Sequence, residues 1–205
     1  MTSLQITDPR VAFAMALVDR ADFLDGPVQR LAGRDAPLSI GHGQTTSQPS
    51  LIAWMIDQLQ VRPGQKVLEI GTGCGYQTAI LSQLGAQVSS MEILEPLARE
   101  AAARLVELDV PNVTVRTGDG YQGWPELAPF DRIIVAAGAK KAPQPLIDQL
   151  APGGRLIIPI GTAEDMKLQL VTRSLDGEVK TEELLPVRFV PLTGAPAEAD
   201  RRPVR

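Results

Sequence analysis

The feature that most constrains the fold is an alternation of short apolar strands and helices that begins at residue 66. The segments 66–70 (KVLEI) and 86–92 (AQVSSME) have the pattern of strands, and a helical segment lies between them at 76–84. The alternation continues with predicted strands at 112–118, 130–138 and 154–161, and with predicted helices at 96–108 and 142–150. Strands that alternate with helices form a mostly parallel sheet covered on both faces. The chain is therefore predicted to be an α/β protein with a doubly wound sheet.

The two ends of the chain depart from this alternation. Segment 166–173 (MKLQLVTR) and segment 178–192 flank Asp176-Gly177, which predicts an antiparallel hairpin at one edge of the sheet. In the first forty residues we expect a short helix that begins at Asp8-Pro9, followed by a loop. Pro49 starts another helix, whose apolar positions Leu51, Ile52, Met55, Ile56 and Leu59 form one stripe.

Composition excludes several classes of protein. The net charge is −4 and the pI is about 5.1, whereas a phosphate backbone is bound by clustered Lys and Arg, so nucleic acid is not an expected partner. One cysteine and one histidine give no intramolecular disulfide and no conventional metal site. There is no apolar run long enough to span a bilayer and no leader pattern, so we expect no membrane association and a cytoplasmic location.

A glycine turn after the first predicted strand indicates a ligand site. Glu69, Gly71, Gly73 and Gly75 form the motif E-x-G-x-G-x-G, and the residue after Gly75 is not the glycine that a dinucleotide fingerprint requires. Glu92 closes the second strand, where an acid can bind both ribose hydroxyls. This combination is typical of S-adenosylmethionine sites in doubly wound methyltransferases. Asp119 and Gly120, in GDG after the third strand, suit recognition of an adenine edge. Cys74, in the turn, is assigned no chemistry.

A strongly polar segment, GHGQTTSQPS at 41–50, precedes the first strand of the sheet by only one helix. Ligands of such sheets bind at the carboxyl ends of the strands. We therefore expect this segment to fold over that crevice and to contact ligand. Whether His42 orders the loop or touches the ligand is open.

Five stretches of sequence together resemble the protein-L-isoaspartate (D-aspartate) O-methyltransferase family. They are PLSIGHGQTTSQP, VLEIGTGCGYQTAILSQL, GDGYQGWPELAPFDRIIVAAGA, QLAPGGRLIIPIG and VRFVPLTG, and the resemblance runs from about residue 8 to residue 193. Its implied fold is a seven-stranded, Rossmann-like methyltransferase sheet with an altered order of the last two strands. Where the family commonly has a bulky residue after S-Q-P, this chain has Ser50.

The resemblance also implies roles for individual residues. Ser47, in T-x-S-Q-P, corresponds to the catalytic serine, and Thr46, Ser47 and Thr193 would bind substrate. The cofactor S-adenosyl-L-methionine would be bound by residues of the covering loop, the glycine turn and the next two strand ends, namely Thr45, Thr46, Glu69, Gly71, Thr72, Gly73, Gly75, Glu92, Asp119 and Gly120. The chain is accordingly expected to divide into three parts: a helix and covering loop at 1–50, the methyltransferase domain at 51–193, and a flexible tail at 194–205.

The implied reaction is methylation of the α-carboxylate of isoaspartyl residues in damaged proteins, whose ester then cyclises to a succinimide. A carboxylate is already ionised at neutral pH, so no general base is needed, and Ser47 would aim the substrate rather than act as a nucleophile. Two other hypotheses remain. One is a related enzyme for a dedicated peptide substrate, and the other is a nucleic-acid methyltransferase, which the acidic charge disfavours.

Overall fold

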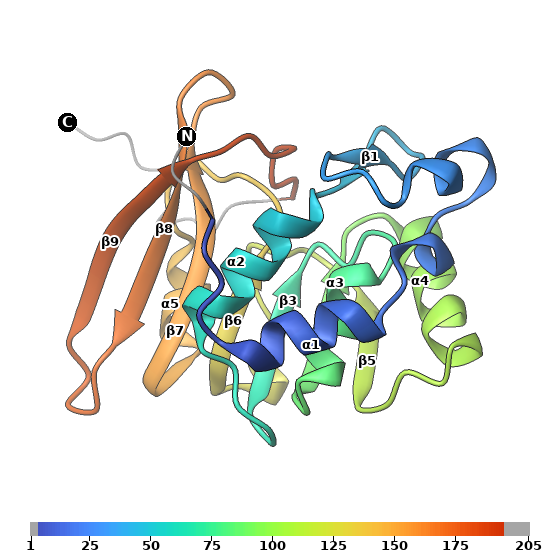
Figure 1. Cartoon of the computed structure of the whole chain (residues 1–205). Helices are drawn as coiled ribbons and strands as arrows, with labels where there is room; N and C mark the ends of the chain where they lie inside the picture. Colours follow the sequence, from blue (N-terminus) through green and yellow to red (C-terminus); the bar gives the residue numbers. More distant parts are fainter. Residues whose placement is uncertain (1–3, 195–205) are drawn as a thin grey trace.

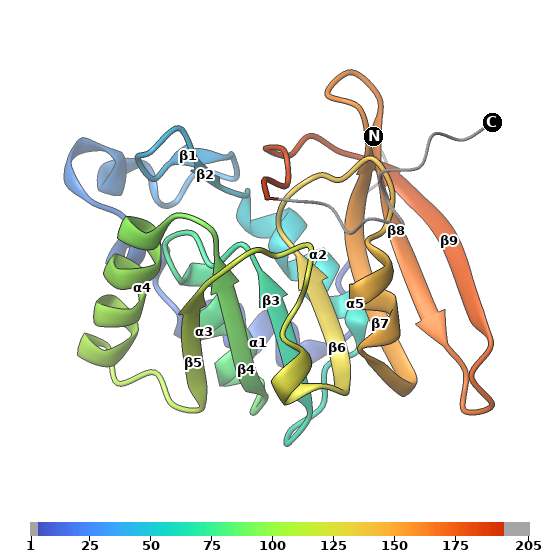
Figure 2. The same cartoon turned by 180° about the vertical axis from the view of Figure 1, so that it is seen from behind.

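The structure is a computed structural model that describes residues 4–194. Its centre is a seven-stranded sheet with the spatial order β5-β4-β3-β6-β7-β8-β9 (Figures 1 and 2). The strands are β3 (Lys66–Ile70), β4 (Gln87–Glu92), β5 (Val113–Thr117), β6 (Phe130–Val135), β7 (Leu150–Gly161), β8 (Met166–Arg173) and β9 (Val179–Pro186). The pairs among β3 to β7 are parallel, and β8 and β9 are added antiparallel at the edge. The predicted mostly parallel sheet with an edge hairpin is confirmed.

Strand β3 lies in the middle of the parallel part of the sheet. Ile70 pairs with Met91 of β4 and with Val135 of β6, so these three strands end at the same level. Strands that are covered on both faces read as continuous apolar runs, and Val67 and Leu68 are both fully buried. The carboxyl ends of β3, β4 and β6 thus form one edge on which a site can be assembled.

Helices cover both faces of this sheet. Helices α1 (Pro9–Leu17), α2 (Pro49–Leu59) and α3 (Tyr76–Gln83) share one core cluster with the strands, and α4 (Glu95–Glu107) joins it through Leu105. The other face packs against α5 (Gln144–Asp148) and the chain before β6, through a cluster that includes Leu146, Trp124 and Phe130. Figure 1 shows α1 and α2 in front of the sheet, and Figure 2 shows α5 in front of the opposite face.

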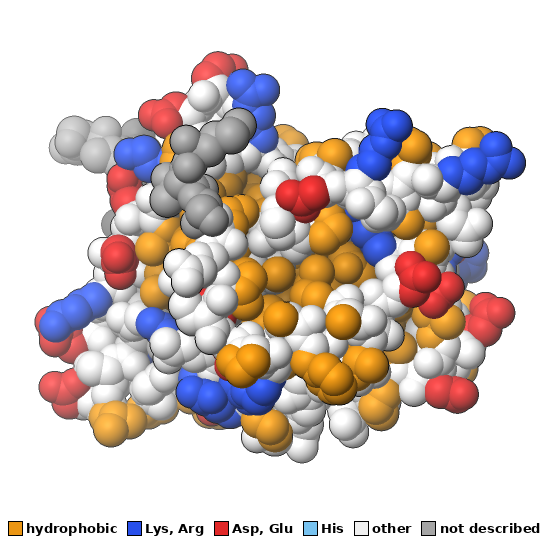
Figure 3. Space-filling model, viewed as in Figure 1, with side chains coloured by type: hydrophobic (Ala, Val, Ile, Leu, Met, Phe, Trp, Pro, Cys, Tyr) orange, Lys and Arg blue, Asp and Glu red, His pale blue; other side chains and the backbone are white. Residues whose placement is uncertain are grey.

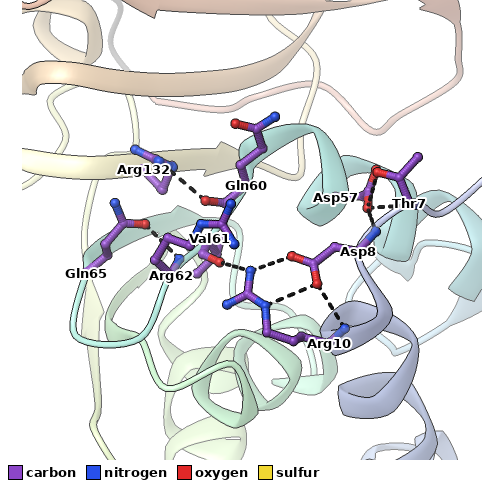
Figure 4. A network of polar contacts seen from close by, with 9 residues as sticks. All are labelled: Thr7, Asp8, Arg10, Asp57, Gln60, Val61, Arg62, Gln65 and Arg132. Carbon is purple, nitrogen blue, oxygen red and sulfur yellow. Dashed lines mark hydrogen bonds and ion pairs between the residues drawn. The ribbon is translucent and has the colours of Figure 1, made fainter.

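Helix α1 is attached to α2 by a polar network (Figure 4). Oδ1 of Asp57, a buried residue near the end of α2, accepts hydrogen bonds from the backbone N–H groups of Thr7 (3.0 Å) and Asp8 (2.8 Å). The Asp8 side chain caps α1 by accepting from the backbone N–H of Arg10, as the Asp-Pro start predicts. Arg10 in turn donates to the carbonyl oxygen of Val61, beyond the end of α2.

The chain between α1 and α2 is more structured than the predicted loop. It contains two 3₁₀ helices, η1 (Arg20–Phe23) and η2 (Gly26–Leu31), and a two-stranded antiparallel sheet of β1 (Leu38–Ser39) and β2 (Thr45–Thr46). We call residues 20–48 the covering segment, because it lies over the carboxyl ends of the parallel strands in both views (Figures 1 and 2). These elements are two to six residues long, too short for a periodic pattern to reveal them.

The predicted helix at 142–150 is shorter than expected. Leu150 already pairs with Phe130 of β6, and the backbone N–H of Phe130 donates to the carbonyl oxygen of Gln149. Strand β7 therefore begins four residues before the predicted start at Gly154, with an irregularity in its register. The short 3₁₀ helix η3 (Pro125–Leu127) precedes β6.

Charged residues are dispersed on the face of the molecule that carries α1 and α2 (Figure 3). Lys and Arg side chains are interspersed with Asp and Glu around a mostly apolar centre. Within residues 4–194, none of the helices has both the length and the hydropathy needed to cross a membrane. The predicted tail spans residues 194–205, and all of it except residue 194 lies outside the described residues.

Candidate functional site

A cleft opens at the carboxyl ends of β3, β4 and β6, beneath the covering segment. Nine of the residues that the sequence singles out line it: Thr45, Thr46, Ser47, Gly71, Thr72, Gly73, Glu92, Gly120 and Thr193. Glu69, Gly75 and Asp119 do not line it. The fold therefore gathers most of the predicted site from five separate stretches of chain into one cleft.

The glycine turn after β3 depends on backbone conformations that favour glycine. Gly71 has φ +92° and Gly73 has φ +54°. A Cβ atom on Gly71 would lie 3.3 Å from Cβ of Ala136, and one on Gly73 would lie 3.1 Å from Cδ1 of Ile40. The turn thus passes close to both β6 and the covering segment, and it leaves its backbone open to the cleft. Gly75 is the N-cap of α3 and packs against α4 instead.

Glu92 stands at the end of β4, with its side chain on the cleft wall. It is 6% exposed, and its Oε2 accepts a hydrogen bond from the backbone N–H of Gly73 at 2.9 Å. Its Oε1 accepts from the backbone N–H of Leu94 at 3.1 Å. A carboxylate oxygen can accept more than one hydrogen bond, so Glu92 can fix the glycine turn and still accept from ligand hydroxyls.

Glu69 lies behind the glycine turn, fully buried between β3, β4 and α3. Its carboxyl group accepts hydrogen bonds from Gln77, Thr78 and Ser90. The Ser90 hydroxyl also lies 2.6 Å from Oγ1 of Thr72, a residue that lines the cleft. Burial raises the pKa of Glu69 to about 7, against the opposing effect of these hydrogen bonds. Glu69 therefore supports the turn from behind, through Ser90 and Thr72, without facing the cleft.

The polar segment 41–50 makes a tight turn and then crosses the cleft. Gly41, His42 and Gly43 have φ values of +83°, +51° and +71°, which reverse the chain between β1 and β2. Thr46, which follows the turn, is 8% exposed, and Ser47 is half-buried on the cleft wall. Thr45, Thr46 and Ser47 thus form part of the cleft wall.

Asp35 is a structural residue of this region that sequence reasoning missed. Its carboxylate accepts from the backbone N–H of Ser50 at 2.9 Å and from the Ser50 hydroxyl at 2.6 Å. These contacts cap the first turn of α2, just after Ser47, from a residue that lies 15 positions earlier in the chain. The hydroxyl of Ser50, the residue that follows S-Q-P, takes part in this cap.

Residues that follow β5 and β9 form another wall of the cleft. Gly120 and Thr193 line it, together with Pro191 and Leu192, which sequence reasoning did not single out. Asp119 turns away and accepts a hydrogen bond from the backbone N–H of Tyr121 at 2.9 Å. A Cβ atom on Gly194 would lie 2.1 Å from Oδ1 of Asp119, so the chain after Thr193 passes directly over this carboxylate.

Cys74 lines the cleft and His42 lies outside its lining, and neither is assigned a part in its chemistry. Nε2 of His42 lies 4.0 Å from Oε1 of Glu100 on α4, at the rim of the covering segment. Burial raises the pKa of the Cys74 thiol, which disfavours a reactive thiolate. Among the described residues, no group of three or more His, Cys, Asp or Glu side chains could hold a metal ion.

A second groove joins the cleft at Thr45, Ser47, Ala136 and Val190, which line both. It runs between α2, the covering segment and the chain that follows β9. Its walls combine apolar side chains, including Leu51, Met166, Leu185 and Phe189, with polar ones, among them Gln48, Glu164, Asp165 and Arg188. Ser47 is thus at the junction of two spaces, the cleft over the glycine turn and this second groove.

The sequence matches the family model described as protein-L-isoaspartate(D-aspartate) O-methyltransferase over residues 2–197. A protein-L-isoaspartate O-methyltransferase of Gloeobacter violaceus is 53% identical over 184 residues, which cover 89% of each chain. Its counterpart in Anaeromyxobacter dehalogenans is 50% identical over 193 residues, which cover 93% of this chain and 92% of that protein.

Solved structures give the same likeness. A Plasmodium falciparum structure described as a protein-L-isoaspartate O-methyltransferase in complex with S-adenosyl-L-homocysteine superimposes with a TM-score of 0.81, at 27% identity and 92% coverage of both chains. Another structure, described as protein-L-isoaspartate O-methyltransferase, gives a TM-score of 0.83 at 30% identity, and covers 92% of this chain and 62% of its own.

Proposed function

The chain belongs to the protein-L-isoaspartate(D-aspartate) O-methyltransferase family, and from this premise we propose that it methylates the α-carboxylate of isoaspartyl residues in damaged proteins and peptides. The observation that carries the proposal is the position of Ser47 at the junction between the cleft over the glycine turn and the second groove. A methyl acceptor that enters along the groove would meet the cofactor at this residue.

The cleft has the chemistry that S-adenosyl-L-methionine requires. Gly71 and Gly73 leave the backbone of the turn accessible, and Glu92 offers a carboxylate to ribose hydroxyls. Gly120 would border the adenine. When bound, the cofactor supplies an electrophilic sulfonium methyl group, which a carboxylate oxygen accepts.

Glu69 and Gly75 would act on the cofactor through the shape of the turn. Glu69 fixes Ser90 and Thr72, and Gly75 starts α3 at a φ of +92°. Asp119, whose carboxylate is held by the backbone N–H of Tyr121, would shape the adenine end in the same indirect way.

The chain's own contribution to the reaction is orientation and exclusion of water. The substrate carboxylate is ionised at neutral pH, so no residue needs to remove a proton. The Ser47 hydroxyl would donate a hydrogen bond to one carboxylate oxygen and aim the other. Thr46 would close the cleft above the substrate, and Thr193 would contact it from the opposite wall. Correct orientation of two reactants can lower a barrier by roughly 7–11 kcal/mol.

The second groove suits an extended peptide. An isoaspartyl residue adds one methylene to the peptide backbone, and its α-carboxylate then branches from the chain. The mixed apolar and polar side chains of the groove would hold the flanking residues, while this carboxylate points past Ser47 into the cleft. Isoaspartyl proteins and peptides are therefore the partners that we propose.

The test is transfer of labelled methyl groups from S-adenosyl-L-methionine to two synthetic peptides that differ only in isoaspartate or aspartate at one position. We expect base-labile label on the isoaspartyl peptide alone. Equal labelling of both peptides would contradict the recognition of isoaspartate. No labelling of either, with cofactor binding intact, would instead indicate a dedicated substrate.

A further inference from the structure

Arg20 of η1 is a buried cation in the covering segment, outside the cleft lining. The residue is 4% exposed, and within residues 4–194 no carboxylate oxygen lies within 4.0 Å of its guanidinium. Backbone carbonyls bind it instead. Nη1 donates to Ala32 at 3.4 Å and to Arg34 at 3.0 Å, and Nη2 donates to Ala36 and Ser47, both at 3.0 Å. Burying a charged group is costly unless it is hydrogen-bonded. The four carbonyl contacts of this guanidinium therefore indicate that the fold holds the Arg20 side chain in a fixed position.

The Ser47 contact links Arg20 to the cleft. Nη2 of Arg20 bridges the carbonyl oxygens of Ala36 and Ser47, which lie on the two sides of the β1–β2 turn. The guanidinium also lies 6.0 Å from the ring centroid of Tyr76, which starts α3 directly after the glycine turn and lines the cleft. A single side chain therefore joins the covering segment, the backbone of Ser47 and the end of the glycine turn.

We propose that Arg20 is a positioning residue for methyl transfer, which acts by holding the backbone of Ser47 in place over the cleft. This inference rests on the proposed role of Ser47. A displacement of about 1 Å in a reacting group can lower a rate by about 100-fold. The planar guanidinium carries five donors in a fixed arrangement, whereas the lysine ammonium is a single centre, so Lys cannot reproduce the bridge.

Arg132 of β6 provides a matched control. It is 9% exposed, and its guanidinium also binds backbone carbonyls, those of Asp131, Gly153 and Gln60. The contact with Gln60 lies just beyond the carboxyl end of α2 (Figure 4). Ser47 instead precedes the start of that helix at Pro49. Replacing either arginine removes a buried cation that binds carbonyls, but only Arg20 contacts Ser47.

The experiment compares Arg20→Lys, Arg20→Gly and Arg132→Gly in the full chain, at a temperature where circular dichroism shows each variant folded. For Arg20→Lys we expect kcat on the isoaspartyl peptide to fall by up to about 100-fold, with little change in the KM for S-adenosyl-L-methionine. Methylguanidinium added to Arg20→Gly should restore part of kcat, and it should have no such effect on Arg132→Gly, whose kcat stays near that of the wild type.

Hydrogen exchange separates this inference from the proposed function, because it does not depend on activity. We expect faster amide exchange over residues 45–48 in both Arg20 variants, and faster exchange near residue 60 in Arg132→Gly. The proposal would be overturned if the amides of residues 45–48 exchanged in Arg20→Lys at the same rate as in the wild type. It would also be overturned if kcat fell equally in the Arg20 and Arg132 variants. If the wild type failed to methylate the peptide while the exchange pattern held, the proposed function alone would be wrong.

Discussion

Oγ of Ser90 lies 2.6 Å from Oε2 of Glu69, and this hydrogen bond ties the centre of the sheet to the glycine turn. Ser90 is fully buried and also contacts Thr72, so the turn rests on a chain of three polar side chains inside an apolar core. The carboxyl group at its base is the one with the strongly raised pKa. The protonation of Glu69 therefore affects both the stability of the fold and the support of the site.

Stability should fall as the pH rises through the range in which Glu69 ionises. The pKa of Glu69 is about 7 in the folded chain and 4.5 in the unfolded reference, so the folded state binds more protons between these values. The free energy of unfolding should decrease by about 3 kcal/mol from pH 4.5 to pH 7 through this group alone. Urea unfolding of the wild type and Glu69→Gln at several pH values in this range measures the difference. An equal pH dependence in both proteins would contradict the prediction.

Loss of the Glu92 charge should weaken cofactor binding. Glu92→Gln keeps an acceptor for the N–H of Gly73 but loses the charge that strengthens hydrogen bonds to ligand hydroxyls. We expect the Kd for S-adenosyl-L-methionine to rise by about 10-fold, which corresponds to about 1.4 kcal/mol. Isothermal titration calorimetry measures it. Glu95→Gln, an exposed change of the same charge in the first turn of α4, is the control and should bind like the wild type.

A methyl group on Gly73 should also reduce cofactor affinity. Gly73→Ala would place a side chain at φ +54°, with its Cβ 3.1 Å from Ile40 of the covering segment. Gly64→Ala is the matched control, since Gly64 has φ +80° and open space around the added atom. Both changes should destabilise the fold by about 1–2 kcal/mol from backbone strain, but only Gly73→Ala should raise the Kd of the cofactor. Equal affinities in the two variants would show that the turn does not approach the ligand.

The fold and most of the cleft follow from local patterns. Because strands alternate with helices along the chain, the strands are expected to be parallel, with their carboxyl ends at one edge of the sheet. Gly71, Gly73 and Glu92 follow or close such strands, so they could be placed together from the sequence. Glu69 shows a limit of motif reasoning. Successive residues of β3 face opposite sides of the sheet, and Glu69 faces Gln77 and Thr78 of α3 rather than the cleft.

The features that could not be predicted depend on contacts between residues far apart in the sequence. Arg20 binds Ser47 across 27 positions, and Asp35 binds Ser50 across 15. An arginine followed by Ala and Asp, or an aspartate before Ala-Pro, has no spacing that identifies such a partner. The two-residue strands β1 and β2 also could not be predicted from a local pattern, because only their pairing with each other defines them.

Removal of the Asp57 carboxylate should destabilise the fold without affecting catalysis. Asp57→Ala leaves the backbone N–H groups of Thr7 and Asp8 without their acceptor and releases α1 from α2. We expect a loss of about 2–4 kcal/mol in the free energy of unfolding, measured by urea denaturation. Asp57→Asn keeps one acceptor oxygen and should lose less. A large drop in kcat at a temperature where Asp57→Ala is folded would contradict the separation of this anchor from the site.

Substitution of Ser47 should separate turnover from cofactor binding. Its side chain lies at the junction of the cleft and the second groove, and its backbone is held by Arg20, so Ser47→Ala removes one hydroxyl and leaves the covering segment in place. We expect kcat on an isoaspartyl peptide to fall by about 10- to 100-fold because the carboxylate is no longer aimed, while the Kd for S-adenosyl-L-methionine stays close to that of the wild type. Steady-state kinetics and calorimetry measure the two quantities. Ser174→Ala, in the exposed turn between β8 and β9, controls for the loss of a serine hydroxyl elsewhere. A large loss of cofactor affinity with unchanged kcat would assign Ser47 to the cofactor instead of the substrate.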